Sequence, residues 1–102
     1  MKEYLNTEEI ISAVQESKEY DLEERTFQFA DRVRKFVRKL PKDICNLEDI
    51  PQLVRASGSE RANYIEANEA FSKKDFYYRI KVCRKESKES RFFLRLMEVG
   101  VN

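Results

Sequence analysis

Two pairs of glutamates, Glu66 with Glu69 and Glu86 with Glu89, have a spacing that could hold a metal. Residues three apart lie on one face of a helix, and carboxylates on facing helices hold pairs of iron or manganese ions in helical bundles. Those sites also use a histidine from a Glu-x-x-His motif, and this chain contains no histidine. We therefore rank a metal-carboxylate enzyme last among the functions considered, and we expect neither a metal nor another cofactor.

The sequence also lacks the residues needed for nucleophilic catalysis and for a phosphate-binding loop. Without histidine, serine and cysteine have no usual general base, and the sequence has no Gly-rich phosphate loop. Cys45 and Cys83 match no metal-ligand spacing, and we expect Cys83 to be a small buried hydrophobe. The sequence therefore predicts that the protein is not an enzyme. The glutamates can instead form ion pairs with basic residues, for which the candidates are Arg55, Arg61, Lys85 and Arg91.

Basic and aromatic residues share one face of the C-terminal helix, where Tyr78 and Phe92 are interleaved with lysines and an arginine. Such a face can bind phosphates and stack on bases. Two other interpretations stay open, a solvated basic face and a protein interface, and exposed aromatic residues fit an interface best. The candidate nucleic-acid-binding residues are Lys74, Lys81, Lys85, Lys88 and Arg95 on this helix, with Arg32 and Lys39 on an earlier one.

Charge alternates in sign along the chain, although the net charge is only +1. Residues 1–24 carry two bases and eight acids, and residues 25–42 carry seven bases and one acid. Residues 43–71 carry two bases and six acids, and residues 72–102 carry nine and four. We favour complementary neighbouring helices as the explanation over a dedicated polyanion site.

Apolar residues recur at alternating steps of four and three, the spacing of helices that pack on one another. The pattern predicts three main helices, over about 21–40, 49–70 and 73–98. A thinner pattern predicts an N-terminal helical segment in 1–19, as a short arm or an extension of the next helix. The predicted fold class is all-α, an antiparallel up-down helical bundle in residues 20–102. The residues expected to be buried are Phe29, Val33, Phe36, Val54, Ile80, Cys83 and Leu94.

Local signals set the expected helix boundaries. Asp21 and Ser72 each precede an acidic residue by three positions, the spacing of a capping box, so each is an expected N-cap. We expect Pro41 to end its helix at about Leu40 and Pro51 to lie in the first turn of the next helix.

Composition is typical of one small helical domain. The chain has 102 residues, of which 38% are charged, with only two glycines and two prolines. Gly58 inside a predicted helix costs about 1 kcal/mol relative to alanine, and a close helix crossing is the simplest reason for it. No apolar run reaches 18 residues, so we expect no membrane-spanning helix. The first ten residues have no apolar signal core, and we expect a reduced, cytoplasmic setting.

Three segments resemble the four-helix bundle protein family, which includes proteins encoded within intervening sequences of bacterial large-subunit ribosomal RNA genes. They are YDLEERTFQFA, PQLVRASGSERANYIEANEA and SKKDFYYRIKVCRKESKESRFFLRL, and the resemblance covers about Tyr20 to Met97. It implies an up-down bundle that forms a ring-like homo-oligomer, a pentamer, with no established catalytic activity. A relative in the group, the accessory protein of diversity-generating retroelements, is basic and binds nucleic acid and a reverse transcriptase.

The main departure from the resemblance is that the family continues into a fourth helix, whereas this sequence stops at Asn102. Either the chain is truncated, or the 6–17 segment or a neighbouring subunit covers the open face. Gly100 can serve as the C-cap of the last helix. Arg55, Asn63 and Glu66 match polar positions of the family motif, which implies an internal hydrogen-bonded network. We expect Glu86 and Glu89 to be its other members.

The leading functional hypothesis is a non-enzymatic, oligomeric helical-bundle adaptor associated with nucleic acid. The alternative is a nucleic-acid-binding accessory protein that uses its basic helix faces. Self-association follows from the wide apolar stripes, which three helices cannot cover among themselves. The sequence names no physiological partner and does not choose between RNA and DNA.

Overall fold

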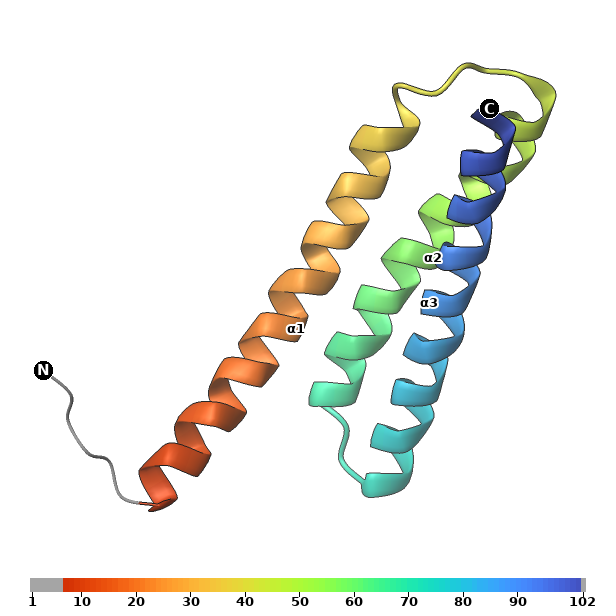
Figure 1. The fold of residues 1–102 in the computed structure, drawn as a ribbon. Coiled ribbons are helices and arrows are strands. Elements are labelled where there is room, and N and C mark those ends of the chain that lie inside the picture. The colour runs from red at the N-terminus through yellow and green to blue at the C-terminus, as the bar shows by residue number, and fades with distance from the viewer. Residues whose placement is uncertain (1–6, 102) are drawn as a thin grey trace, which may run out of the picture.

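Three helices make up the computed structural model, which describes the backbone of residues 7–101 and the side chains of residues 22–97. They are α1 (Thr7–Val37), α2 (Ile44–Asn68) and α3 (Lys73–Val101), and the described chain contains no strand. In Figure 1 the chain ascends along α1, descends along α2 and ascends again along α3. The predicted all-α fold class is confirmed.

α1 is one continuous helix, so the N-terminal segment extends the first predicted helix. The expected N-cap at Asp21 is wrong, because Asp21 lies inside α1. No glycine or proline interrupts this stretch, and aspartate in a helix interior costs less than about 0.7 kcal/mol. Continued helix propagation therefore outweighs the local capping pattern. Asn6 also stands three residues before a glutamate, Glu9, which predicts a cap at the start of the N-terminal segment, and Asn6 lies outside the described residues.

The last turn of α1 tightens ahead of Pro41. The backbone N–H of Lys39 donates to the carbonyl of Phe36 at 3.0 Å, and that of Leu40 donates to Val37 at 3.2 Å. These bonds reach back three residues instead of four, as in a 3₁₀ turn. The helix therefore ends at Val37, three residues before the predicted end, because a residue that precedes proline avoids the helical conformation.

α2 starts earlier than predicted because Asp43 is its N-cap. The Asp43 backbone is extended, and its Oδ1 accepts from the backbone N–H of Asn46 at 2.9 Å. Pro51 consequently lies in the helix interior and not in the first turn. The helix ends at Asn68, two residues before the predicted end.

α3 begins as predicted, with Ser72 as its N-cap. The Ser72 Oγ accepts from the backbone N–H of Asp75 at 3.1 Å, and the Ser72 carbonyl accepts from Phe76 at 3.0 Å. The helix continues through Gly100 to Val101. Gly100 is thus inside the helix, and its expected C-cap role is wrong.

The centre of the small core takes one residue from each helix, Val33, Leu53 and Met97, all at most 3% exposed, and α2 adds the buried residues Ala56, Tyr64 and Ala67. It lies where the C-terminal part of α1 and the first half of α2 meet the C-terminal part of α3. The partly buried residues packed against it are Phe29, Val37, Leu40, Ile50, Val54, Phe93 and Leu94.

Among the residues expected in the core, Val33 is fully buried. Five others are only partly buried, namely Phe29, Val54, Ile80, Cys83 and Leu94. Phe36 is 38% exposed, so its predicted burial is wrong. The reason is that α1 runs along α2 and does not run beside α3 in the described chain, which leaves the Phe36 side of α1 partly uncovered.

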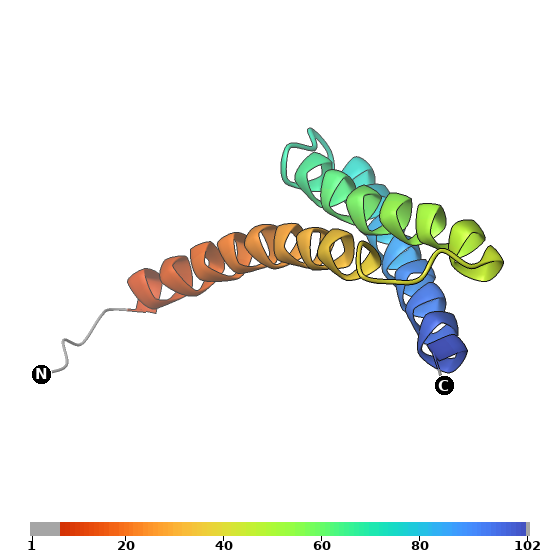
Figure 2. The ribbon, with the colours of Figure 1, turned by 90° about the horizontal axis from the view of Figure 1, so that it is seen from above.

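The arrangement is open. α2 packs along both other helices, whereas α1 and α3 do not run side by side in the described chain. Figures 1 and 2 show the N-terminal half of α1 projecting beyond the α2–α3 hairpin. The radius of gyration is 17.6 Å and the thinnest extent is 17 Å, although a compact chain of this length has a radius of about 13 Å. The three helices of the single chain therefore pack as an open bundle, with α2 in contact with both neighbours.

Candidate functional site

A chain of polar side chains joins α2 to α3 and begins at Arg55. Arg55 donates from Nη1 to both carboxylate oxygens of Glu86, at 3.3 and 3.4 Å, and from Nη2 to Glu89. The side chain of Glu86 is 9% exposed, whereas that of Arg55 is 51% exposed. The guanidinium therefore reaches from solvent to a nearly buried carboxylate and compensates its charge.

The network continues along α2 in steps of four residues. Ser59 Oγ donates to Glu86 at 3.3 Å, and Asn63 Nδ2 lies 3.2 Å from Ser59 Oγ. Arg79 of α3 closes the far end, since its Nη1 donates to Asn63 Oδ1 at 2.9 Å. Residues four apart share a helix face, so one row of α2 residues meets α3 over several turns. The network fixes how the two helices are aligned along their length.

Four of the five residues proposed for this network are brought together, namely Arg55, Asn63, Glu86 and Glu89. Glu66 is exposed on α2, and no hydrogen bond in the described part of the chain joins it to the others. Ser59 and Arg79 complete the network and were not predicted. The spacing signals Ser59, which lies four residues after Arg55 and four before Asn63. No sequence signal identifies Arg79.

A thiol and a carboxylate lie beside the network without forming a catalytic pair. Cys83 Sγ donates to the backbone carbonyl of Glu60 at 3.3 Å. Burial raises the pKa of the Cys83 thiol, and the nearby Glu60 carboxylate raises it further. Burial also raises the pKa of Glu60, while a hydrogen bond from Ser87 opposes that shift. The thiol therefore stays protonated at neutral pH, which makes it a poor nucleophile.

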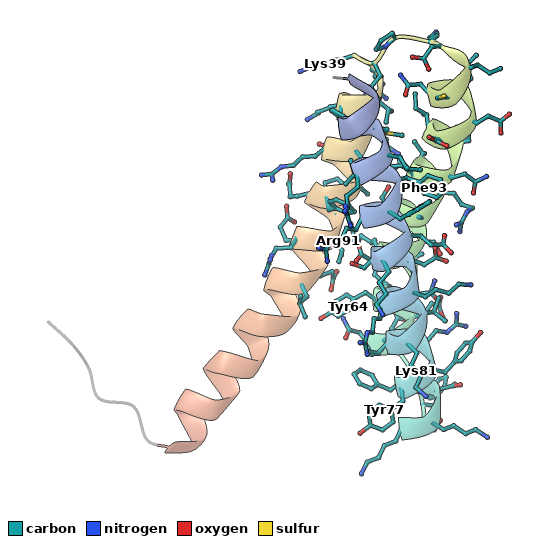
Figure 3. The ribbon with its side chains drawn as sticks, turned by 45° about the vertical axis from the view of Figure 1, so that its right-hand side comes forward. Lys39, Tyr64, Tyr77, Lys81, Arg91 and Phe93 are labelled. Atoms are coloured by element: carbon teal, nitrogen blue, oxygen red, sulfur yellow. The ribbon has the colours of Figure 1, made fainter. Side chains whose placement is uncertain are left out.

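The side of α3 that points away from α2 is strongly basic, and we call it the outer face of α3. Its bases are Lys74, Lys81, Arg84, Lys85, Lys88, Arg91 and Arg95, all exposed. Its exposed apolar and aromatic residues are Tyr77, Tyr78, Phe92 and Leu96. Figure 3 shows Tyr77 and Lys81 near the start of this helix and Arg91 farther along it. Within the described residues, the acid at the edge of this face is Glu89, which Arg55 holds.

A shallow concavity of about 600 Å³ lies on the outer face of α3. Its lining residues are Lys81, Arg84, Lys85, Lys88, Glu89 and Phe92. Three of the predicted nucleic-acid-binding lysines therefore surround one hollow with an aromatic ring in it. The arrangement suits a long anionic partner, because bases are repeated along the helix and do not converge on a single point.

The two predicted binding residues outside α3 lie elsewhere. Arg32 is exposed on α1, which does not pack along α3 in the described chain. Lys39 is exposed in the turn after α1 and lines a separate cavity of about 410 Å³ with Leu96 and Met97. The structure therefore gathers the five α3 candidates on one face and leaves Arg32 apart from them.

The contact between α1 and α2 depends on arginines. Arg61 of α2 lies 3.9 Å from a carboxylate oxygen of Glu23 and 5.1 Å from the centre of the Phe27 ring. A Cβ added at Gly58 would lie 3.2 Å from an Arg34 guanidinium nitrogen. The absence of a side chain at Gly58 therefore makes room for the Arg34 side chain of α1. The close approach at Gly58 is thus made by a side chain, and not by the backbone of a crossing helix.

The described residues show neither a metal-binding cluster nor a membrane-spanning helix. They contain no cluster of three or more cysteine, aspartate or glutamate side chains placed to hold a metal ion. No helix in the described chain combines the length and apolar character needed to cross a membrane.

Comparisons of the chain with protein-family models, with curated proteins and with solved structures found no match.

Proposed function

We propose that this protein is a non-enzymatic helical-bundle adaptor whose open fold is completed by further copies of the same chain. The observation that carries the proposal is the radius of gyration, 17.6 Å against about 13 Å for a compact chain of this length. A thin, splayed arrangement with a small core leaves much of α1 and α3 without a packing partner among the described residues. Association with other copies is the simplest way to cover those surfaces.

The exposed apolar side chains support the same proposal. On α1, Leu22, Phe27 and Phe36 are between 38% and 46% exposed. On α3, Tyr78 and Phe92 are more than half exposed. Soluble monomers rarely keep large contiguous apolar patches in water, and aromatic residues are enriched in protein interfaces. Both α1 and α3 thus carry surface that suits a helical partner.

The polar groups of the α2–α3 hairpin support a structural role over a catalytic one. Arg55 and Glu86 are paired with each other, and Cys83 donates to a backbone carbonyl. A general acid, base or nucleophile has to be free to reach a substrate. The ring-like pentamer implied by the resemblance to the four-helix bundle family is one assembly that would complete this fold.

Light scattering on the full chain at micromolar concentration tests the proposal. We expect a mass that is a multiple of the 12.2 kDa of one chain. A monodisperse species of one chain mass that melts cooperatively would overturn the proposal, because it would mean that the splayed chain is stable alone.

One observation favours nucleic-acid binding as a second candidate function. The outer face of α3 presents seven exposed bases among exposed aromatic side chains, the combination used by sequence-independent single-strand binders. Replacing Lys81, Lys88 or Arg95 by alanine should then lower the slope of log affinity against log salt by about one unit each. Binding that does not depend on salt would contradict this candidate.

A further inference from the structure

The projecting half of α1 is acidic. Residues 1–24 carry eight acids and two bases, and α1 runs through this stretch from Thr7 as one helix. Glu9 and Glu16 stand seven residues apart in this stretch, whereas Glu23, at the next position of the repeat, lies 3.9 Å from Arg61 of α2 in the same chain. Seven residues complete almost two turns and advance about 10.5 Å along the axis, so such residues lie in a row on one face. The segment thus carries a line of negative charge with a fixed repeat.

The outer face of α3 carries the opposite charge with the same repeat. Lys81, Lys88 and Arg95 also recur every seven residues, and all three are exposed. Two helices laid side by side with these repeats would bring acid opposite base at each step. Charge and repeat are therefore complementary.

The two surfaces do not meet within one chain. α1 packs against α2 and does not run beside α3 in the described chain. The outer face of α3 points away from α2, and Figures 1 and 2 show the first half of α1 extending away from the hairpin. A contact between the two surfaces therefore requires two molecules.

We propose that the acidic first half of α1 of one copy docks along the outer face of α3 of a second copy. This inference rests on the proposed self-association and specifies the surfaces that make it. The contact joins two different surfaces, so it can be repeated around a ring or made reciprocally in a dimer. It also explains how a chain of net charge +1 can carry two strongly charged surfaces, because each one neutralises the other in the assembly.

Charge reversal on each side, followed by mixing, tests the docking. One variant carries Lys81→Glu and Lys88→Glu, and the other carries Glu9→Lys and Glu16→Lys. We expect each variant alone to associate about 100-fold more weakly than the unaltered chain, because like charges then face each other. An equal mixture should regain a higher mass by light scattering, because every contact between the two variants pairs opposite charges.

A matched control carries Arg38→Glu and Lys42→Glu in the exposed link between α1 and α2, with the same change in net charge as the Lys81→Glu, Lys88→Glu variant. We expect it to keep the mass of the unaltered chain. Circular dichroism checks that each variant remains helical. If a variant does not fold, a sodium chloride titration of the unaltered chain replaces it. The dissociation constant should then rise with salt, and a constant or falling value overturns the docking.

The outcomes separate this inference from the proposed function. If the unaltered chain is monomeric, both fall together. If it is oligomeric and either reversed variant keeps its mass, or the mixture gains none, the docking alone is overturned. A third outcome is that the masses stay unchanged while Lys81→Glu with Lys88→Glu abolishes binding to labelled poly(U). In that case the outer face of α3 is a nucleic-acid surface, and the docking is also overturned.

Discussion

Removing the hydroxyl group of Ser90 should stabilise the protein. Ser90 lies on α3 with 1% of its surface exposed, and its Oγ has no hydrogen-bond partner among the side chains that the structure describes. A buried hydroxyl without a partner costs about 1–3 kcal/mol in mutational data. Alanine is also the better helix former by about 0.5 kcal/mol. Since the deletion of one oxygen atom leaves a small void that offsets part of the gain, we expect Ser90→Ala to raise the free energy of unfolding by about 1–2 kcal/mol.

Ser57 provides the matched control on the facing helix. It is 0% exposed, like Ser90, but its Oγ donates to the carbonyl of Val54 at 3.1 Å. Ser57→Ala loses a hydrogen bond worth about 1 kcal/mol and gains the same helix propensity, so the net change should be slightly destabilising. Urea denaturation of both variants at one protein concentration gives the comparison, through the midpoints at unchanged slope. If Ser90→Ala is as destabilising as Ser57→Ala, the Ser90 hydroxyl is hydrogen-bonded and the reasoning is wrong.

Three further outcomes follow from the described contacts. Leu53→Ala should lower the free energy of unfolding by about 2–5 kcal/mol, because Leu53 is 0% exposed in the core; a loss near that of the exposed control Leu47→Ala would contradict the core assignment. Ser72→Ala should destabilise by about 0.5–2 kcal/mol through loss of the α3 cap, which the urea midpoint measures, and no change would contradict the cap. Glu60 has a pKa raised by burial above its usual 4.5, so its ionisation in the folded state costs stability as the pH rises through the raised pKa. Glu60→Gln should therefore be more stable than the unaltered chain at neutral pH and equally stable below pH 4.5, and an advantage confined to low pH would refute that sign.

The spacing of apolar residues predicted the all-α fold class, and the capping signal at Ser72 predicted where α3 begins. The cap at Ser72 is confirmed because the hydroxyl group and the N–H that it accepts from are three residues apart. The same spacing at Asp21 misled, since a cap forms only where the preceding residues leave the helix, and those before Asp21 continue it. The capping-box spacing therefore locates the start of a helix only when the chain before it is not helical, as in the turn at residues 69–72.

Burial and the polar network depend on which helices meet, and the sequence does not specify that. Phe36 has the spacing of a core residue, but in the part of the chain that the structure describes α1 does not run beside α3, and Phe36 stays 38% exposed. Glu86 is buried although it is charged, because Arg55 and Ser59 reach it from α2. The row of Arg55, Ser59 and Asn63 on one face of α2 could be predicted from their spacing of four residues. The hydrogen bond from Arg79 to Asn63 could not, because it depends on how α3 is aligned along α2.

The dependence of thermal unfolding on protein concentration tests most directly whether copies of the chain complete the fold. When folding is coupled to association, the melting temperature Tm rises with concentration by mass action. We expect Tm to increase steadily when the full chain is melted over about a hundredfold range of concentration, as followed by circular dichroism. A Tm that is sharp and constant over that range would mean that the open three-helix chain is stable by itself, and would contradict the proposed self-assembly.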